Sequence, residues 1–226
     1  MTATSKRSAA DYLPKKRTLP ALRQAATLCH GCDLYKRATQ TVFGEGPGDS
    51  PVMMVGEMPG DQEDVQGAPF VGPAGRLLDA ALAEMGIPRK EIYVTNAVKH
   101  FKWEERGKKR LHKKPGRREV VACRAWLEAE IFTVRPKIIV ALGGTAAQSL
   151  LGMSFRITQK RGEIIYSEWA PVLIATYHPS AILRAPSSED RRRMRQEFVA
   201  DLRLAFSLVN ARENNESSDC RATKHR

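Results

Sequence analysis

Residues 51–60 read PVMMVGEMPG, an apolar run followed at once by a turn that contains two glycines. The continuous run Pro51–Val55 predicts a buried strand, because a half-exposed strand would alternate apolar and polar residues. Gly56 and Gly60 predict the turn that ends this strand. Three further apolar runs predict buried strands of the same kind: Ile92–Val94, Ile138–Leu142 and Val172–Ala175.

Amphipathic helices are expected between these strands. Apolar residues recur at helical spacing in 77–85, where Gly86 is placed to end the helix, and again in 120–131. A short helix is predicted after Gly143-Gly144, and a last one from about Glu189 to Val209. This alternation predicts an α/β fold of three layers, α/β/α, around a central, mostly parallel four-stranded sheet. Ligands bind such sheets at the carboxyl ends of the strands, so the motifs found there are expected to share one pocket.

The charge balance of the chain is unusual. Its 226 residues include 37 Lys and Arg against 25 Asp and Glu, a formal net charge of +12. This excess favours a polyanionic partner, because each cation bound to a phosphate backbone releases a counterion. No apolar run approaches the roughly 18 residues that span a bilayer, so a cytoplasmic protein is expected. One domain over residues 21–209 is predicted between a flexible basic segment, 1–20, and a flexible tail, 210–226.

A glycine-rich segment, 56–76, follows the first strand and contains several carboxylates as well as Phe70. The carboxylates could hold a water molecule or stabilise a cation, and Phe70, in a loop between two glycines, could stack on a flat ring. A polar loop with one apolar plug is the alternative. The segment matches neither the phosphate-binding P-loop nor the dinucleotide-binding fingerprint.

His178 follows the last predicted strand, in the motif Tyr177-His178-Pro179-Ser180. A histidine at this position could donate a hydrogen bond to a developing anion. A structural histidine beside a proline is the alternative.

Cys29 and Cys32 form a Cys-x-x-Cys pair, and Cys123 lies far downstream. Such a pair places two thiolates where one metal ion or cluster can bind both, and a redox dithiol is less expected because no strand precedes the pair. Cys220 lies in the polar tail, so His100 is the better candidate for a fourth ligand. Three cysteines and one histidine suit zinc as well as an iron–sulfur cluster.

Residues 106–118 contain eight Lys or Arg among thirteen residues, at neither helical nor strand spacing, and Gly107 and Gly116 predict a loop. Phe101 and Trp103 lie just before this segment. Cations next to stacking groups are typical of single-strand nucleic-acid sites, whereas a merely solvated surface is the alternative.

In this order the motifs resemble the uracil-DNA glycosylase superfamily, and specifically its iron–sulfur family four, over roughly Cys29 to Leu204. The resemblance implies that Gly56–Gly60, with Glu57, lies at the abasic sugar and that His178 stabilises the departing uracil anion. It implies that Phe70 stacks on uracil and that Asn96 reads the pyrimidine edge. Gly56, Met58 and Asp61 complete the expected uracil site. A 4Fe-4S cluster, with zinc less expected, would be bound by Cys29, Cys32, His100 and Cys123.

Two departures from family four are informative. Lys99-His100-Phe101 replaces the usual Lys-Cys-Arg-Pro-Pro, and the gap from His100 to Cys123 is longer because of the basic segment. That segment is similar to the Lys-Arg-Arg-Ile-His-Lys loop of the UdgX branch, whose loop histidine attaches covalently to uracil-containing DNA. One mismatch is Met58, where the branch typically has Gln.

The second resemblance implies a single-turnover glycosylase. His112 would be the covalent nucleophile, and the expected DNA contacts are Lys108, Lys109, Arg110, Lys113 and Lys114. The protein is expected to be a monomer. Its expected partner is uracil-containing DNA, preferably single-stranded, with free uracil as product. A multiple-turnover repair glycosylase and a non-catalytic, metal-stabilised DNA-binding module are the alternatives.

Overall fold

The computed structural model describes residues 8–222, with the side chains of the last helix described as far as Val209. Four strands form the central sheet: β1 (Val52–Gly56), β2 (Tyr93–Asn96), β5 (Ile138–Leu142) and β6 (Val172–Thr176). Their order is β2-β1-β5-β6, and every neighbouring pair is parallel. The predicted strands are therefore confirmed, each within one or two residues at its ends.

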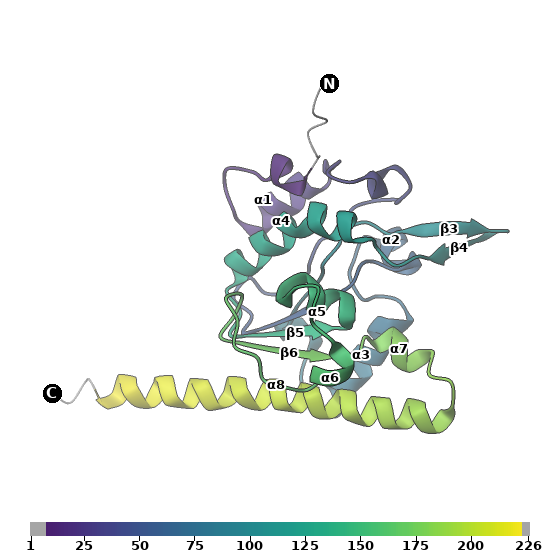
Figure 1. Ribbon diagram of the computed structural model, residues 1–226. Helices are drawn as coiled ribbons and strands as arrows, with labels where there is room; N and C mark the ends of the chain where they lie inside the picture. Colours follow the sequence, from purple (N-terminus) through teal and green to yellow (C-terminus); the bar gives the residue numbers. More distant parts are fainter. Residues whose placement is uncertain (1–7, 223–226) are drawn as a thin grey trace.

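Every residue of these four strands is buried, which explains why their sequences lack alternation. Helices α3 (Pro73–Glu84) and α8 (Ser188–Ala222) cover one face through a core that includes Met54, Leu82 and Phe198. Helices α4 (Arg117–Val134) and α5 (Gly144–Leu151) cover the other face through a core that includes Met53 and Leu127. Figure 1 shows these layers, and the predicted three-layer α/β/α fold is confirmed.

A third apolar cluster lies against the outer side of α4. It joins α1 (Leu19–Ala26) to the first half of α4 and includes Leu22, Phe43, Phe101 and Trp126. The remaining elements are short: η1 (Ala9–Tyr12), η2 (Asp33–Lys36), α2 (Asp61–Gln66), η3 (Arg89–Glu91), α6 (Ile157–Lys160) and α7 (Pro179–Leu183). Among the described residues, no helix is both long and apolar enough to cross a membrane.

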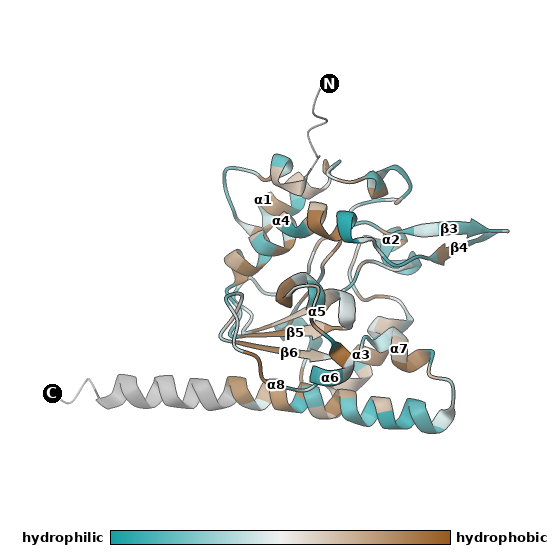
Figure 2. Cartoon of the chain, in the orientation of Figure 1, coloured by the Kyte–Doolittle hydropathy of each residue, from teal (hydrophilic) through white to brown (hydrophobic). Residues whose placement is uncertain are grey.

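The first half of the basic segment belongs to a β-hairpin and its last two residues begin α4, so the prediction of a loop is correct only for residues 113–116. Strands β3 (Trp103–Arg106) and β4 (Lys109–His112) pair antiparallel, with Trp103 opposite His112 and Arg106 opposite Lys109. Gly107 begins the two-residue turn at φ 59°, the positive φ that a type II′ hairpin turn requires there. The hairpin extends from the body and is mainly hydrophilic (Figures 1 and 2). Its sequence therefore lacks the alternation of apolar and polar residues from which a strand can be predicted.

The ends of the predicted domain differ in detail from the structure. Helix α8 continues to Ala222, past its predicted end at Val209. Within the predicted N-terminal segment, Ala9 is fully buried and belongs to the third apolar cluster. Residues 1–7 and 223–226 lie outside the described residues, so the division into a domain and two flexible ends stays a prediction.

Candidate active site

The first wall of the site is formed where β1 and β2 end side by side. Gly56 and Asn96 are register partners at this edge, and Asn96 is only 3% exposed. Its Oδ1 atom is buried and has no hydrogen-bond partner among the described residues. A Cβ atom at Gly56 would lie 2.3 Å from that oxygen and 2.6 Å from Cζ of Phe70, so only glycine fits. A buried acceptor beside an aromatic ring is suited to an N–H donor of a flat ligand.

Phe70 is held in a strained backbone conformation beside this acceptor. Its φ is 57°, a value that side-chain-bearing residues rarely adopt. Gly75 makes the conformation possible, because a Cβ atom there would lie 1.6 Å from the carbonyl oxygen of Phe70. The ring centroid of Phe70 lies 5.9 Å from that of His178, with 31° between the ring planes. Two of the predicted site residues are thus brought together.

Glu63 connects the two glycine turns that surround this pocket. Its Oε2 accepts a hydrogen bond of 3.1 Å from the backbone N–H of Gly60, and its Oε1 accepts one of 2.8 Å from Gly72. The side chain is buried at 7% exposure. Both oxygens of this carboxylate are therefore engaged by backbone N–H groups of the loops that carry Glu57 and Phe70.

His178 is prepared as a neutral hydrogen-bond donor. Its Nδ1 accepts a hydrogen bond of 3.1 Å from the backbone N–H of Ser180 and lies 2.7 Å from the Ser180 hydroxyl. Because a backbone N–H can only donate, Nδ1 carries no proton, and the neutral ring has its proton on Nε2. Burial, and then the nearby Arg184 and His112, lower the pKa of His178 to about 4. At neutral pH the ring can donate from Nε2 without being charged.

Glu57 and His112 approach each other next to these residues. The Oε2 atom of Glu57 accepts a hydrogen bond from the hydroxyl of Thr145, at the start of α5, while its Oε1 lies 3.7 Å from Nε2 of His112. That separation is too long for a hydrogen bond. Burial lowers the pKa of His112, Glu57 acts in the opposite direction, and Arg184 lowers it further. The half-exposed imidazole is therefore mainly neutral at neutral pH.

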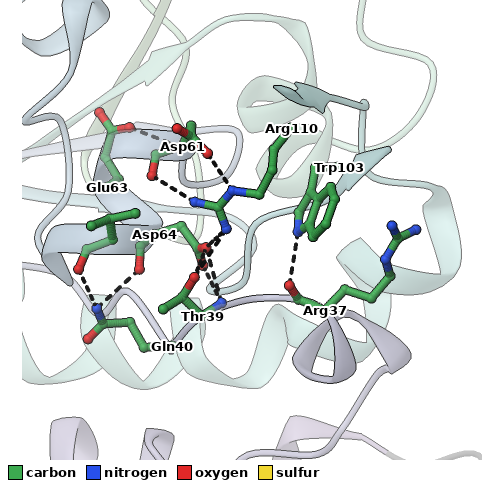
Figure 3. A network of polar contacts seen from close by, with 10 residues as sticks. Arg37, Thr39, Gln40, Asp61, Glu63, Asp64, Trp103 and Arg110 are labelled. Carbon is green, nitrogen blue, oxygen red and sulfur yellow. Dashed lines mark hydrogen bonds and ion pairs between the residues drawn. The ribbon is translucent and has the colours of Figure 1, made fainter. Parts of the chain in front are cut away.

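The hairpin that carries His112 is fastened to α2 by Arg110 (Figure 3). Its Nε lies 2.6 Å from Oδ1 of Asp61, and its Nη1 lies 2.7 Å from Oδ2 of Asp64. Asp64 is fully buried and also accepts hydrogen bonds from the backbone N–H and the hydroxyl of Thr39. Trp103, on the paired strand, donates from Nε1 to the carbonyl oxygen of Arg37 at 2.9 Å. These contacts fix the hairpin to the body.

Two residues that were predicted to contact ligands form part of this network instead. Arg110 was predicted to bind DNA and Asp61 to bind uracil, but in the structure their charged groups pair with each other. The sequence could not reveal a pair between a turn after β1 and a distant hairpin. The other predicted DNA contacts have exposed side chains, as a surface contact requires: Lys108, Lys109, Lys113 and Lys114. Lys113 also forms an ion pair of 2.8 Å with Glu104 on the opposite strand.

Comparison with known proteins now identifies the family. A family model for the Uracil DNA glycosylase superfamily matches residues 43–203, more than half of the chain. The chain belongs to the uracil-DNA glycosylase superfamily. It is 40% identical over 182 residues to the Type-4 uracil-DNA glycosylase of Thermotoga maritima, a match that covers 80% of this chain and 89% of that protein. It is 37% identical over 195 residues to the Type-4 enzyme of Pyrobaculum aerophilum, with 83% and 93% covered.

Met58 lies inside the Gly-Glu-x-Pro-Gly motif of this glycosylase, yet its side chain does not face the pocket. It is 5% exposed and belongs to the third apolar cluster, together with Phe101, Cys29 and Cys123. The prediction that Met58 contacts uracil is therefore not supported by its side chain. A thioether gains more from the apolar cluster than from the polar pocket edge.

The three cysteines gather in that same cluster, where two of them accept hydrogen bonds. Cys29 Sγ accepts from Nε1 of Trp126 at 3.2 Å, and Cys123 Sγ accepts from the backbone N–H of Lys99 at 3.3 Å. Burial raises the pKa of Cys123 to about 12 and also raises that of Cys32, so burial alone favours their thiol forms.

His100, the predicted fourth ligand, has a hydroxyl partner at one ring nitrogen. His100 Nε2 lies 2.9 Å from the hydroxyl of Thr41. Within residues 8–222, no group of three or more His, Cys, Asp or Glu side chains is arranged to hold a metal ion. As these side chains lie, the four predicted ligands do not form a site for a 4Fe-4S cluster or for zinc.

Sequence reasoning missed several polar residues that support the glycosylase pocket. Thr145 binds Glu57, and Arg184 acts electrostatically on both His112 and His178. Thr145 follows Gly143-Gly144 directly after β5, so its place at a strand end was the available signal. Arg184 follows a helix of only five residues, and nothing in the local pattern marks it.

Proposed function

We propose that this protein excises uracil from DNA and remains covalently bound to the resulting abasic sugar through His112. The observation that carries the proposal is the approach of His112 Nε2 to within 3.7 Å of Glu57 Oε1, beside a pocket formed by Asn96, Phe70 and His178. The Type-4 uracil-DNA glycosylases that resemble the chain support the substrate, and the hairpin histidine supports the capture.

Uracil recognition in this proposal uses the unpaired oxygen of Asn96. Uracil presents an N3–H donor that can satisfy Asn96 Oδ1, while its ring stacks against Phe70. The Nε2–H of His178 donates to a uracil oxygen, where negative charge develops as the glycosidic bond breaks. Extrusion of the base costs a few kcal/mol in a duplex and less in a single strand, which favours single-stranded DNA as substrate.

The covalent step balances as a substitution at C1′ of the sugar. The bond from C1′ to N1 of uracil breaks, and its electron pair leaves with uracil as the anion that His178 stabilises. The lone pair of His112 Nε2 forms the new bond to C1′. The ring then loses its Nδ1 proton to solvent, while uracil takes up a proton. Glu57 stabilises the cation-like sugar through its negative charge.

Capture is favoured by the chemistry of the hairpin. A nucleophilic imidazole must be neutral, and the lowered pKa of His112 keeps it so at neutral pH. The exposed Lys108, Lys109, Lys113 and Lys114 would bind the phosphates on either side of the flipped nucleotide.

Denaturing gel electrophoresis tests the proposal directly. The protein is mixed with a uracil-containing single-stranded oligonucleotide, and a heat-stable band of protein plus DNA is expected, with released uracil in a one-to-one ratio to that band. A matched oligonucleotide with thymine in place of uracil is the control. Uracil release without any such band would rule out covalent capture.

A multiple-turnover glycosylase is the second candidate. It is favoured by the 48% exposure of the His112 side chain, which leaves room for water at the mouth of the pocket. In that case the released uracil would exceed the amount of protein by many-fold. A non-catalytic DNA-binding module would instead bind DNA tightly without regard to uracil.

The 4Fe-4S cluster stays a proposal that depends on Cys29, Cys32, Cys123 and the resemblance to family four. When bound, such a cluster would join the segment after α1 to α4, and none of the steps above depends on it. Iron analysis and absorbance near 400 nm test it, whereas zinc would give a colourless protein. We also propose that the protein acts as a monomer in the cytoplasm.

A further inference from the structure

Lys99 and Glu130 form an ion pair in the interior, at 0% side-chain exposure on both sides. Lys99 lies three residues after the end of β2, and Glu130 lies in α4. A buried ion pair contributes little net stability, since an apolar pair of similar size is often as good or better. Stability alone is therefore a weak reason for these charges, and neither has a part in the chemistry described above.

Hydrogen bonds satisfy both partners of the pair. Glu130 accepts from the backbone N–H of Gly44 at 2.9 Å, from the Tyr93 hydroxyl at 3.0 Å and from the Thr95 hydroxyl at 2.9 Å. The three protons of Lys99 Nζ have three acceptors: Glu130 Oε2, Thr95 Oγ1 at 2.6 Å and the backbone carbonyl of Asn96 at 2.7 Å. The last of these bonds ends on the residue that carries the unpaired pocket oxygen.

The chain at Asn96 is fixed on both sides by these contacts. After Asn96 the backbone N–H groups of Ala97 and Val98 donate to the carbonyls of Gly56 and Glu57, at 2.9 and 3.0 Å. The carbonyl of Asn96 itself is bound by Lys99. With the peptide plane thus fixed, the side chain of Asn96 is aimed beside Gly56 and Phe70, where its Oδ1 stays buried and unpaired.

We propose that Lys99, held by Glu130, is a positioning residue that aims the Asn96 amide at the base, an inference that rests on the proposed function. The pair holds Asn96 in place before any ligand arrives, so recognition needs no rearrangement. The aimed acceptor suits a pyrimidine with an N3–H, as in uracil, and disfavours cytosine, whose N3 is itself an acceptor. The pair thereby contributes to base specificity without touching the base.

A four-protein comparison tests this role. The double variant Lys99→Met/Glu130→Gln removes both charges together, so that neither is left buried alone. It is compared with the wild-type protein, with Asn96→Ala and with the triple variant. Inhibition by free uracil and the single-turnover rate at increasing concentrations of uracil-containing single-stranded oligonucleotide are measured, along with the melting temperature.

The double variant is expected to weaken inhibition by free uracil about five- to tenfold, the value of one well-placed hydrogen bond. The half-saturating DNA concentration should rise in step, with a smaller change in the maximal rate. In the Asn96→Ala background the same two substitutions should change uracil inhibition by less than about twofold, because there is no amide left to aim.

If the two substitutions weaken uracil inhibition equally in the wild-type and Asn96→Ala backgrounds, the inference is wrong and the ion pair has only a structural role. If the double variant does not fold, Glu130→Asp replaces it, since this keeps both charges but draws the carboxylate back from Lys99 by one methylene. Glu130→Asp must then also weaken uracil inhibition in the wild-type background and change it by less than about twofold in the Asn96→Ala background. A wild-type protein that neither binds free uracil nor releases it from DNA would refute the proposed function itself, which distinguishes the two failures.

Discussion

The Nε2 atom of His112 lies 3.7 Å from the Oε1 atom of Glu57, although the two residues are positioned by strands of different sheets. Glu57 follows β1 of the central sheet, and His112 ends the second strand of an exposed hairpin. The hydroxyl of Thr145 holds the other carboxylate oxygen, while Arg110 fastens the hairpin to Asp61 and Asp64. These contacts with other elements hold an imidazole and a carboxylate close together.

Replacing His112 separates capture from excision. His112→Ala is expected to abolish the heat-stable adduct, because the ring nitrogen that bonds to C1′ is gone. Uracil release should persist and exceed one equivalent, since water then reaches the sugar. Lys109→Ala is the matched control on the same strand and should retain the adduct at saturating DNA, because it removes one phosphate contact but leaves the imidazole. An undiminished adduct in His112→Ala would show that another residue is the nucleophile.

Replacing Thr145 tests the orientation of Glu57. Thr145→Val keeps the shape but leaves Oε2 of Glu57 without its donor, so the carboxylate can rotate away from His112. A hydrogen bond to a charged group contributes about 1.5–3 kcal/mol, which predicts a fall in the rate of adduct formation of about tenfold or more. Thr145→Ser restores the hydroxyl and should recover most of the rate in single-turnover measurements. Full activity in Thr145→Val would contradict this role.

The pH dependence of capture should respond to Arg184. The guanidinium lowers the pKa of His112 and of His178, because it disfavours a second positive charge nearby. In Arg184→Gln both pKa values rise, so protonation sets in at higher pH. The acidic limb of the plot of adduct rate against pH should therefore move to higher pH, with little change above pH 8. A limb that stays in place would exclude this electrostatic coupling.

The lowered pKa of His178 also makes the free energy of unfolding depend on pH. Its folded pKa of about 4 lies below the ordinary value of 6.5, so the unfolded chain binds the proton more readily. This contribution to stability is fully present above pH 6.5 and is lost as the pH falls towards 4. Denaturant titrations at pH 7.5 and 5 should show a smaller difference in His178→Gln than in the wild-type protein.

Removing the hairpin anchor should cost stability as well as capture. Arg110→Ala leaves the fully buried Asp64 without its cation, at a cost of roughly 2–4 kcal/mol, below the range for fully buried pairs because Arg110 is 24% exposed. Adduct formation should slow at the same time, since His112 is no longer held at Glu57. Lys108→Ala, at the exposed turn, should change stability by less than about 0.5 kcal/mol. Similar effects of both substitutions would argue against an anchoring role.

Part of this site could be predicted from the sequence because the features that mark it are formed by residues that are neighbours along the chain. The apolar run before Gly56, the polar residue Asn96 at the end of β2 and the motif around His178 each mark the end of a strand. In a parallel sheet those ends meet at one edge, so a shared pocket followed from the order of the motifs. Phe70 was predicted from another local feature, because it is an aromatic residue in a loop between two glycines.

The contacts between distant segments could not be predicted in this way. The basic segment looked like a loop because an exposed hairpin needs no apolar alternation, and its turn depends on the positive φ of Gly107. Arg110 looked like a DNA contact until Asp64, buried at another place in the chain, proved to be its partner. Met58 looked like a pocket residue but packs into the apolar cluster behind it.

By itself, the sequence determined the layers of this protein, because hydrophobic periodicity depends only on neighbours along the chain. It also determined which residues stand at the carboxyl ends of β1, β2 and β6. Only the tertiary structure decided which charges are neutralised and which atoms are left unpaired. Those outcomes depend on distance in space, as when Lys99 pairs with Glu130 while Asn96 Oδ1 has no partner among residues 8–222.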